Sequence, residues 1–358
     1  QASTEIDPGA RTPRYVGQPI GLVVARGRAQ AEDAAELVDI DIDPLPFVVG
    51  IDAALAEGAP LVYPEAGNNV AGEIHFGDGA DELERVIGSA PRLIERRLSV
   101  QRVVHSPMEP RGVLAEWIPT TRALTVWTST QAPHVVRRQF AAALRLRDDQ
   151  IRVVAPDVGG SFGGKVVPHV DEVLVCLAAM LLGRRVKWTE DRAENLTTSY
   201  QGRGQQAHVR LVLDHDHRFL ALYTRIHGDL GAFATQAGSG PFQVAGLVAE
   251  GPYRFERAGA TVTCVHTNTV PTGAYRGYGM QEASWIRERV IEEAARELGL
   301  DPVELRLRNM IGPEQMPYTT RTGLTYDSGD YPAVLRRATE LARAHRRPST
   351  HTVRRGSA

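Results

Sequence analysis

Apolar and polar residues alternate over short stretches along most of this chain, a pattern that predicts strands, and stretches with helical spacing lie between them. Near the start, residues 15–25 and 38–43 follow the strand pattern, and the alanine-rich residues 29–37 predict a short helix. We expect these three segments to form a small α+β unit. Residues 44–69 are rich in proline, alanine and glycine without a sustained period, which is typical of a connector.

The rest of the chain alternates between predicted strands and predicted helices and forms a larger body. The predicted strands cover residues 94–104, 113–118, 124–129, 151–156, 186–189, 208–213 and 219–227. The predicted helices cover residues 131–144, 170–182 and 285–298. The last of these is amphipathic from Trp285 to Leu298 and is followed by the capping residue Gly299, so we expect it to be scaffold. The order of the elements predicts a mixed α+β fold.

The segment from Asp157 to Lys165 contains four glycines within six residues, between a predicted strand and a predicted helix. Glycines let backbone N–H groups approach a ligand closely, and a crossing from strand to helix is a common place for phosphates and other oxyanions. The segment therefore indicates a site for a large anionic cofactor.

Two other interpretations of this segment stay open. Gly159, Gly164 and Lys165 fit the first seven positions of the nucleotide-binding pattern GxxxxGK[ST], but Val166 stands where that pattern needs a magnesium-binding hydroxyl. The structural alternative is a turn that only lets two elements pack closely, and it is less favoured because the four glycines frame Phe162.

A second glycine-rich segment, from Gly273 to Gly279, places Arg276 and Tyr278 directly before a helix. Arginine and neighbouring N–H groups can bind an oxyanion, and a tyrosine between glycines can lie against a flat substrate. The alternative is structural, with Arg276 in a salt bridge and Tyr278 filling a gap in the core.

The composition is that of an ordinary globular protein, with 42% hydrophobic and 23% charged residues among 358. A formal net charge of −2 gives no overall attraction for nucleic acid, and no apolar run is long enough to span a bilayer, so we expect a cytoplasmic protein. The two cysteines, Cys176 and Cys264, are too few for a four-thiolate iron–sulfur cluster and predict packed thiols.

Three smaller groups of polar residues favour structure over chemistry. Residues 215–217 (His-Asp-His) predict a solvated hairpin, because neighbouring side chains on a tight turn point in different directions. Asp171 and Glu172 stand at the start of a predicted helix, where acids favour the helix dipole. Glu109 and Arg111 predict a buried ion pair.

Seven segments spread over the chain, in a fixed order, carry a family resemblance. They are Tyr15–Pro19, His105–Arg111, Trp127–His134, Gly159–Lys165, Asp191–Leu196, Ala274–Gly279 and Glu292–Pro302. In these segments the chain resembles the molybdenum-binding large subunit of the xanthine dehydrogenase, aldehyde oxidase and aerobic carbon monoxide dehydrogenase family. The resemblance implies the C-terminal part of an α/β hammerhead domain in residues 1–55, a connector in 56–79, and the first mixed α/β molybdenum-cofactor-binding domain in 80–341.

The resemblance also implies the chemistry of a molybdenum hydroxylase. Members of the family hold molybdenum in a molybdopterin cofactor, often extended as a cytosine dinucleotide, and hydroxylate an electron-poor carbon with oxygen from water. Their electrons leave through a small subunit with two-iron clusters and a medium subunit with FAD. The implied ligand is a small-molecule substrate, and neither nucleic acid nor a membrane is implied.

By resemblance, the backbone N–H of Phe162 lies next to the molybdenum centre, and the glycines around it permit that approach. The residues implied in cofactor binding are Gln131, Gly160, Phe162, Gly163, Gly164 and Arg276. Tyr278 stands where family enzymes place an aromatic residue that stacks on the substrate, and Arg203 where several keep an arginine that binds or polarises it. No residue is implied as a direct ligand of the metal.

Three positions depart from the family's patterns. Val166 stands where xanthine-oxidising members have a glutamate, and Gly277 where copper-containing carbon monoxide oxidisers have a cysteine. Val103 replaces a glutamine that many members place two residues before the equivalent of His105. These departures argue against a purine and against carbon monoxide, and they favour an aldehyde or an N-heteroaromatic substrate.

The catalytic residue stays unknown, because the family's general-base glutamate lies in a later domain whose sequence is not found here. We therefore expect a fragment, or one piece of a split subunit, that works with a missing C-terminal part of the large subunit. Residues 342–358 predict a basic, disordered tail. A P-loop-like nucleotide-binding enzyme and a cofactor-free remnant that only binds partner subunits are the alternatives to the hydroxylase.

Overall fold

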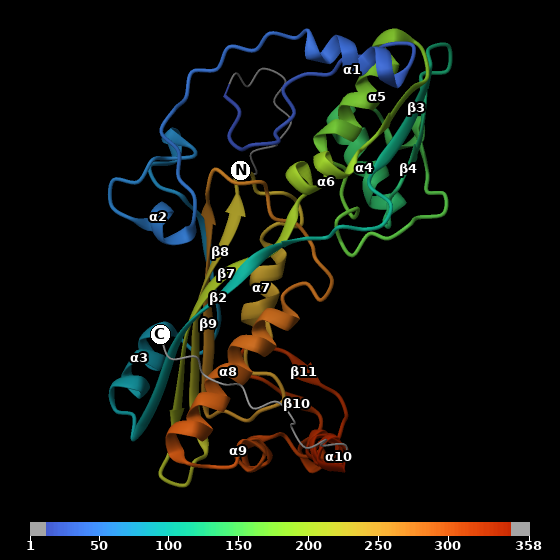
Figure 1. The fold of residues 1–358 in the computed structure, drawn as a ribbon. Coiled ribbons are helices and arrows are strands. Elements are labelled where there is room, and N and C mark those ends of the chain that lie inside the picture. Colours follow the sequence, from blue (N-terminus) through green and yellow to red (C-terminus); the bar gives the residue numbers. More distant parts are fainter. Residues whose placement is uncertain (1–11, 345–358) are drawn as a thin grey trace, which may run out of the picture.

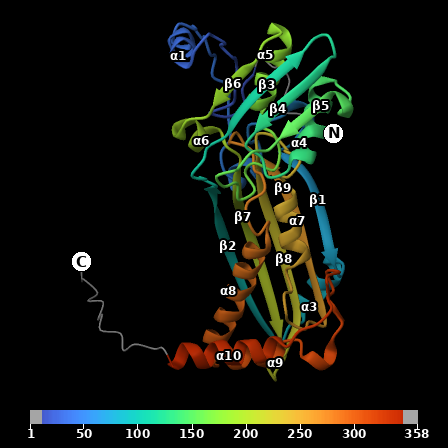
Figure 2. The ribbon, with the colours of Figure 1, turned by 90° about the vertical axis from the view of Figure 1, so that its right-hand side faces the viewer.

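Two β-sheets, one of five strands and one of four, carry most of the fold in this computed structural model, which describes residues 12–344. Figure 1 shows the five-stranded sheet at one end of the molecule and the four-stranded sheet with its helices at the other. The view in Figure 2, turned by 90°, keeps the same division and shows loops gathered where the two sheets meet. The mixed α/β class predicted from the sequence is confirmed.

The larger sheet is almost entirely antiparallel. Its order is β1 (Val70–Gly77), β9 (Arg257–His266), β8 (Phe219–Gly231), β7 (Gln201–Leu213) and β2 (Arg92–Val104), and only β8 and β9 run parallel. The hairpin predicted around residues 215–217 joins β7 to β8, and within residues 12–344 no three acidic, histidine or cysteine side chains gather as a metal site.

Helices α7 (Gly240–Leu247) and α8 (Met280–Leu298) cover one face of this sheet and form the main core with it (Figure 1). Every second residue of β7 from Ala207 to Leu213 is buried there, because side chains alternate between the two faces of a strand. Helix α8 forms as predicted and ends at Gly299 in a left-handed cap. Trp285 was placed on its apolar face by the sequence pattern but is 41% exposed, so that assignment was wrong.

The smaller sheet has the order β5 (Ile151–Val154), β4 (Ala123–Thr128), β3 (Gly112–Ile118) and β6 (Val186–Thr189). Helices α4 (Pro133–Leu144) and α5 (Val170–Leu182) contribute to one apolar core with it, separate from the core of the larger sheet. Cys176 lies inside this core and Cys264 inside the other, which confirms both as buried free thiols.

The strands predicted at residues 15–25 and 38–43 were wrong, although the helix between them forms as α1 (Arg28–Glu36). Neither segment has a strand partner within residues 12–344, and the first begins with a turn at residues 15–17. Most of their apolar side chains stay in solvent, with Ile20 and Ile42 58% and 62% exposed, whereas Tyr15 is buried. A β pattern becomes a strand only when a neighbouring strand completes its hydrogen bonds, and none does so here.

Several elements went unpredicted, chiefly because they are short or lack a clear period. They are α2 (Ile51–Leu55), η1 (Pro64–Ala66), β1, α3 (Ala80–Gly88), η2 (Asp148–Gln150), α6 (Arg192–Thr198), α7, β9, α9 (Pro302–Asn309), η3 (Pro313–Gln315), β10 (Tyr318–Thr319), β11 (Thr325–Tyr326) and α10 (Tyr331–Ala344). The predicted tail begins inside α10, and its residues 345–358 lie outside the described part. From residue 12 to residue 344, no helix combines the length and the apolar character needed to cross a bilayer.

The contact between β8 and α7 gives a test of the main core. A Cβ atom on Gly228 would lie 2.2 Å from the ring of Phe242, which is fully buried. We expect Gly228→Ala to lower the free energy of unfolding by about 1–3 kcal/mol, the usual cost of overpacking, as measured by urea denaturation. Gly72→Ala in β1 is the control, since a Cβ there meets no atom within 4 Å. Equal stability of the two variants would contradict the packing described here.

Candidate functional site

The glycine-rich segment at residues 157–165 forms a loop between β5 and α5. Its shape depends on its glycines, which have no side chain. Phe162 has a left-handed backbone with φ of 54°, and Gly160 and Gly163 beside it have φ of 103° and 102°. A Cβ atom on Gly163 would lie 2.4 Å from the carbonyl oxygen of Ala274, closer than real Cβ atoms come. The loop can therefore approach this second segment only with glycine at position 163.

The second segment is residues 273–279, and a main-chain hydrogen bond joins it to the loop. The N–H of Arg276 donates to the carbonyl oxygen of Phe162 at 2.8 Å. The side chains of both residues remain exposed, Phe162 to 44%. The two segments, which the family resemblance implies in cofactor binding, thus lie in direct contact, and together we call them the cradle.

Gln131 joins the same loop from the start of α4. Its side-chain carbonyl oxygen accepts hydrogen bonds from the N–H of Gly163, at 3.0 Å, and from the hydroxyl of Ser161. Its own N–H donates to the carbonyl oxygen of Lys165 at 3.2 Å. Gln131 therefore fixes the conformation of the loop, and within the described residues its side-chain NH2 group makes no hydrogen bond.

Arg203, at the start of β7, reaches the cradle from the larger sheet. Its Nη2 donates to the carbonyl oxygen of Arg276 at 3.0 Å, and its Nη1 donates to Oε1 of Glu282 at 2.8 Å. Its guanidinium lies 4.5 Å from the centre of the Tyr275 ring, a cation–π contact. The structure thus brings Arg203 to the cradle, where it contacts the carbonyl oxygen of Arg276.

Tyr278, the other implied substrate residue, also belongs to the second segment. It has a left-handed backbone with φ of 52°, and its hydroxyl points to the carbonyl oxygen of Ala237 at 3.5 Å. A Cβ atom on Gly240 would clash with that hydroxyl. Burial raises the pKa of Tyr278, so the hydroxyl stays neutral and acts as a donor.

His105 links the cradle to the end of β2 and was not singled out from the sequence. Its Nε2 donates to the carbonyl oxygen of Ala274 at 2.6 Å, and its ring lies 4.7 Å from that of Tyr275. A Cβ atom on Gly164 would come within 3.0 Å of this ring. Burial lowers the pKa of His105, which keeps the imidazole neutral near pH 7. The neutral ring therefore packs against both the glycine loop and the segment at residues 273–279.

Lys165 does not stand where a nucleotide-binding lysine would be free to reach phosphates. Its ammonium group is buried and donates to the carbonyl oxygen of Glu109 at 2.8 Å and to the hydroxyl of Ser129 at 2.7 Å. Burial lowers the pKa of Lys165, and the carboxylate of Glu109 opposes that shift. The lysine holds the loop to the residues that follow His105, which argues against the P-loop interpretation.

The ion pair predicted between Glu109 and Arg111 was wrong. Arg111 turns the other way and pairs with Asp171 at 2.7 Å and with Glu190 at 2.6 Å. Both oxygens of Asp171 accept from Arg111, a bidentate geometry that a guanidinium favours. Glu109 instead faces Lys165, with its Oε2 3.4 Å from the ammonium nitrogen.

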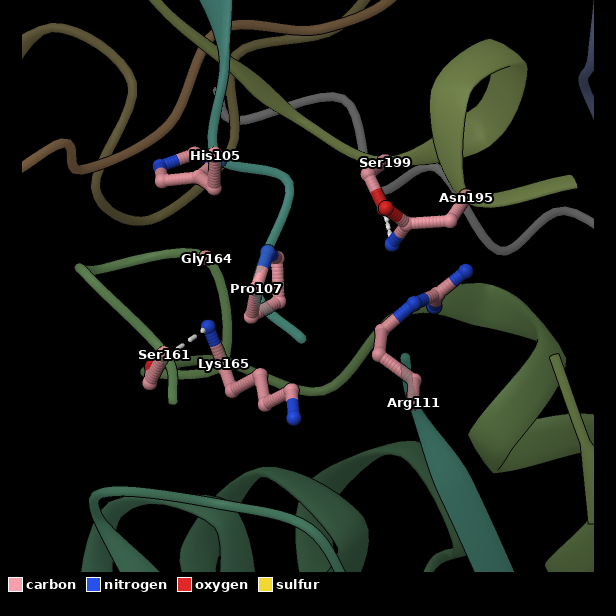
Figure 3. A pocket seen from close by; sticks show the side chains of 8 residues that line it. All are labelled: His105, Pro107, Arg111, Ser161, Gly164, Lys165, Asn195 and Ser199. Atoms are coloured by element: carbon pink, nitrogen blue, oxygen red, sulfur yellow. Dashed lines mark hydrogen bonds between the residues drawn. The ribbon is translucent and has the colours of Figure 1, made fainter. Parts of the chain in front are cut away.

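A small enclosed space lies between this ion-pair network and the glycine loop (Figure 3). Figure 3 shows His105 and Gly164 on one side, Arg111, Asn195 and Ser199 on the other, and Pro107 between them. Its volume of about 10 Å³ holds about one water molecule. The space is too small for a cofactor.

The sequence analysis missed the residues that contact the two segments of the cradle, or the residues next to them, and hold them in place. They are Arg102, His105, His169, Asp229, Tyr275 and Glu282. His105 and Tyr275 lie within two of the segments that carry the family resemblance, so the resemblance could have marked both residues. Nothing in the sequence marks Glu282 or Asp229, because each is one acid among many.

Glu172, which the sequence analysis assigned to the helix dipole, does stand in the first turn of α5 but is fully buried. Burial raises its pKa to about 7, and the Thr128 hydroxyl donates to it at 2.6 Å. Between pH 4.5 and 7 the unfolded chain loses this proton while the folded chain keeps it, so the folded state loses stability as the pH rises.

We expect Glu172→Gln to remove this loss, which is roughly 3 kcal/mol across that interval. Urea denaturation of both proteins at a series of pH values measures it. Glu293→Gln is the control: the guanidinium of Arg96 lowers the pKa of Glu293, so its titration lies below pH 4.5 and leaves this interval unchanged. Parallel curves for the parent and Glu172→Gln would contradict the assignment.

Comparison with known proteins places this geometry in a family. A model described as "Molybdopterin cofactor-binding domain" matches residues 62–310, most of the chain and both glycine-rich segments. The chain is 35% identical to the carbon monoxide dehydrogenase large chain of Hydrogenophaga pseudoflava over 335 residues, which are 89% of this chain and 42% of that protein. It is 32% identical to the nicotine 6-hydroxylase large subunit of Paenarthrobacter nicotinovorans, covering 92% of this chain and 42% of that protein.

The fold agrees with solved structures as well. The crystal structure of quinoline 2-oxidoreductase from Pseudomonas putida 86 aligns with a TM-score of 0.83 and 37% identity, over 89% of this chain and 41% of that one. The chain thus spans about two fifths of the length of these relatives. It belongs to the family of molybdopterin-dependent oxidoreductases, as a portion of the large subunit that carbon monoxide dehydrogenases and xanthine dehydrogenases share.

Proposed function

We propose that the chain holds a molybdenum–molybdopterin cofactor on the cradle formed by its two glycine-rich segments, and that it hydroxylates an aldehyde or an N-heteroaromatic carbon. The observation that carries the proposal is the hydrogen bond from the N–H of Arg276 to Phe162, beside a contact that only Gly163 allows. This glycine-dependent approach brings two main-chain segments together, and closely placed backbone N–H groups suit a large anionic group.

The residues of the cradle fit such a group. Arg276 is exposed and has no acidic partner within 4 Å among residues 12–344, so its charge is available to an anion. Gln131 has a side-chain NH2 group without a partner in the same range. We propose Gln131, Gly160, Phe162, Gly163, Gly164 and Arg276 as the binding residues. We propose the cytosine dinucleotide form of this cofactor.

When bound, the cofactor supplies the redox chemistry that adds an oxygen from water to the substrate carbon. The chain's own residues bind and orient. The loop and Arg276 hold the anionic group, Arg203 directs N–H groups to an acceptor on the substrate, and the ring of Tyr278 offers a flat surface. The general base lies outside this set, and we propose that it comes from a further part of the large subunit.

The substrate class follows from the departures and from the relatives. Gly277 offers no thiolate for copper, and Val166 no carboxylate for a purine. Two relatives are named for N-heteroaromatic compounds, nicotine and quinoline. We propose an N-heteroaromatic compound or an aldehyde for this chain, with the flat Tyr278 ring favouring the former.

The proposed assembly contains partner chains. One relative is named as the gamma subunit of a dehydrogenase complex, and others as large chains. We propose a small subunit with two-iron clusters, a medium subunit with FAD, the remainder of the large subunit, and a cytoplasmic location. We keep residues 1–55 as part of a hammerhead domain and 80–341 as the cofactor-binding domain; the family match at 62–310 supports the latter.

We expect Gly163→Ala to reduce bound molybdenum and pterin at least about tenfold, because its Cβ would push the segment at Ala274 away from the loop. Metal analysis and fluorescence of the oxidised pterin measure this on the full chain purified with the proteins that accompany it. Gly79→Ala is the control, since a Cβ there meets no atom within 4 Å.

The same preparations separate the alternatives. Parent protein with bound nucleotide and no pterin would replace the proposal by the P-loop enzyme. Parent protein with neither would indicate a remnant that only binds partner subunits. Full cofactor content in Gly163→Ala, with the parent also loaded, would show that the cradle is not the binding surface.

A further inference from the structure

The two arginines of the cradle differ in their charge balance. Arg276 is exposed and has no carboxylate within 4 Å among residues 12–344. Arg203 is 13% exposed and pairs with Glu282 at 2.8 Å, a carboxylate with only 1% of its side chain exposed. The site therefore contains one free cation and one that is already neutralised.

The pair of Arg203 and Glu282 is exclusive. Glu282 makes no second ion pair within residues 12–344, and its other oxygen, Oε2, has no hydrogen-bond partner there. A buried carboxylate is stable as a charge only when a cation compensates it, so Glu282 depends on Arg203. In turn, Glu282 holds Nη1 of Arg203 and fixes the guanidinium over the ring of Tyr275.

The ion pair with Glu282 holds the guanidinium of Arg203 in one orientation, and the pair as a whole has no net charge. A guanidinium carries five N–H donors, and the hydrogen bonds to Glu282 and to the carbonyl oxygen of Arg276 use two of them. The remaining donors can bind a neutral acceptor such as a ring nitrogen or a carbonyl oxygen. A substrate carboxylate would meet the repulsion of Glu282 together with the attraction of Arg203, and the two largely cancel.

We propose that Glu282 is a positioning and specificity-determining residue, which neutralises Arg203 and so makes the site select uncharged ring substrates over those that carry a carboxylate. The inference rests on the proposed function, because it takes Arg203 as a substrate contact. It extends that function by naming the charge class of the substrate and the residue that sets it.

Nicotinamide and nicotinate test this inference, because they share one ring and differ in charge. Their dissociation constants are measured by calorimetry on the complete chain, purified with the proteins that accompany it. We expect the parent to bind nicotinamide more tightly. Glu282→Gln keeps a hydrogen-bond acceptor for Arg203 but removes the charge, so we expect the preference to shift toward nicotinate by about tenfold or more.

Two further variants test the direction of the change in preference and whether the charge of Glu282 causes it. Arg203→Gln leaves the negative charge of Glu282, so we expect nicotinate to bind still more weakly relative to nicotinamide. Glu282→Asp keeps the charge and should keep the parent's preference. Glu293→Gln is the matched control on the same helix: it removes a carboxylate paired with Arg96 on β2 and should leave the ratio unchanged. If Glu282→Gln does not fold, Arg203→Gln alone still decides the sign.

Cofactor content on the same preparations separates the two levels of the argument. Parent protein without molybdenum and pterin would overturn the proposed function, and the inference with it. Parent protein that holds the cofactor would overturn only the inference if it prefers nicotinate, binds neither compound, or shows the same ratio in Glu282→Gln.

Discussion

The close approach of two backbone segments is the constraint on which the rest of this structure depends. The loop around Phe162 belongs to the four-stranded sheet, whereas residues 273–279 lead into α8 on the five-stranded sheet. They touch because Gly163 has no Cβ atom, and the N–H of Arg276 then reaches the carbonyl of Phe162. A site at the junction of two separate cores needs such a contact, since neither core alone fixes its position.

Side chains from β2 and β7 hold this contact in place from the larger sheet. His105 supports the carbonyl of Ala274, and the Tyr275 ring contacts both the His105 ring and the Arg203 guanidinium. Arg102, also on β2, pairs with Asp229 and bonds the hydroxyl of Thr272, just before the second segment. The approach of the backbones is therefore stabilised by packing and by charge, in addition to one hydrogen bond.

The smaller sheet holds its side of the junction with buried charges. Arg111 compensates Asp171 and Glu190, and Lys165 is held by Ser129 and the carbonyl of Glu109. Removing one partner of such a pair leaves an uncompensated charge in the interior, which costs more than the pair itself contributes. These groups shape the loop and stay out of contact with any ligand on its exposed side.

The sequence by itself determined the strands and helices around the smaller core, part of those around the larger core, and both glycine-rich segments, because period and glycine spacing are local properties. It left α7 and β9 of the larger core unpredicted. It predicted α5 and β6 at their observed bounds, and it named the segments around Phe162 and Arg276. Only the tertiary structure decided who pairs with whom: Arg111 with Asp171 instead of Glu109, Arg203 with Glu282, and no strand partner for residues 15–25 or 38–43 within the described part. The physical reason is that ion pairs and strand ladders join residues far apart in the chain, and a local pattern states what a residue needs but not which partner supplies it.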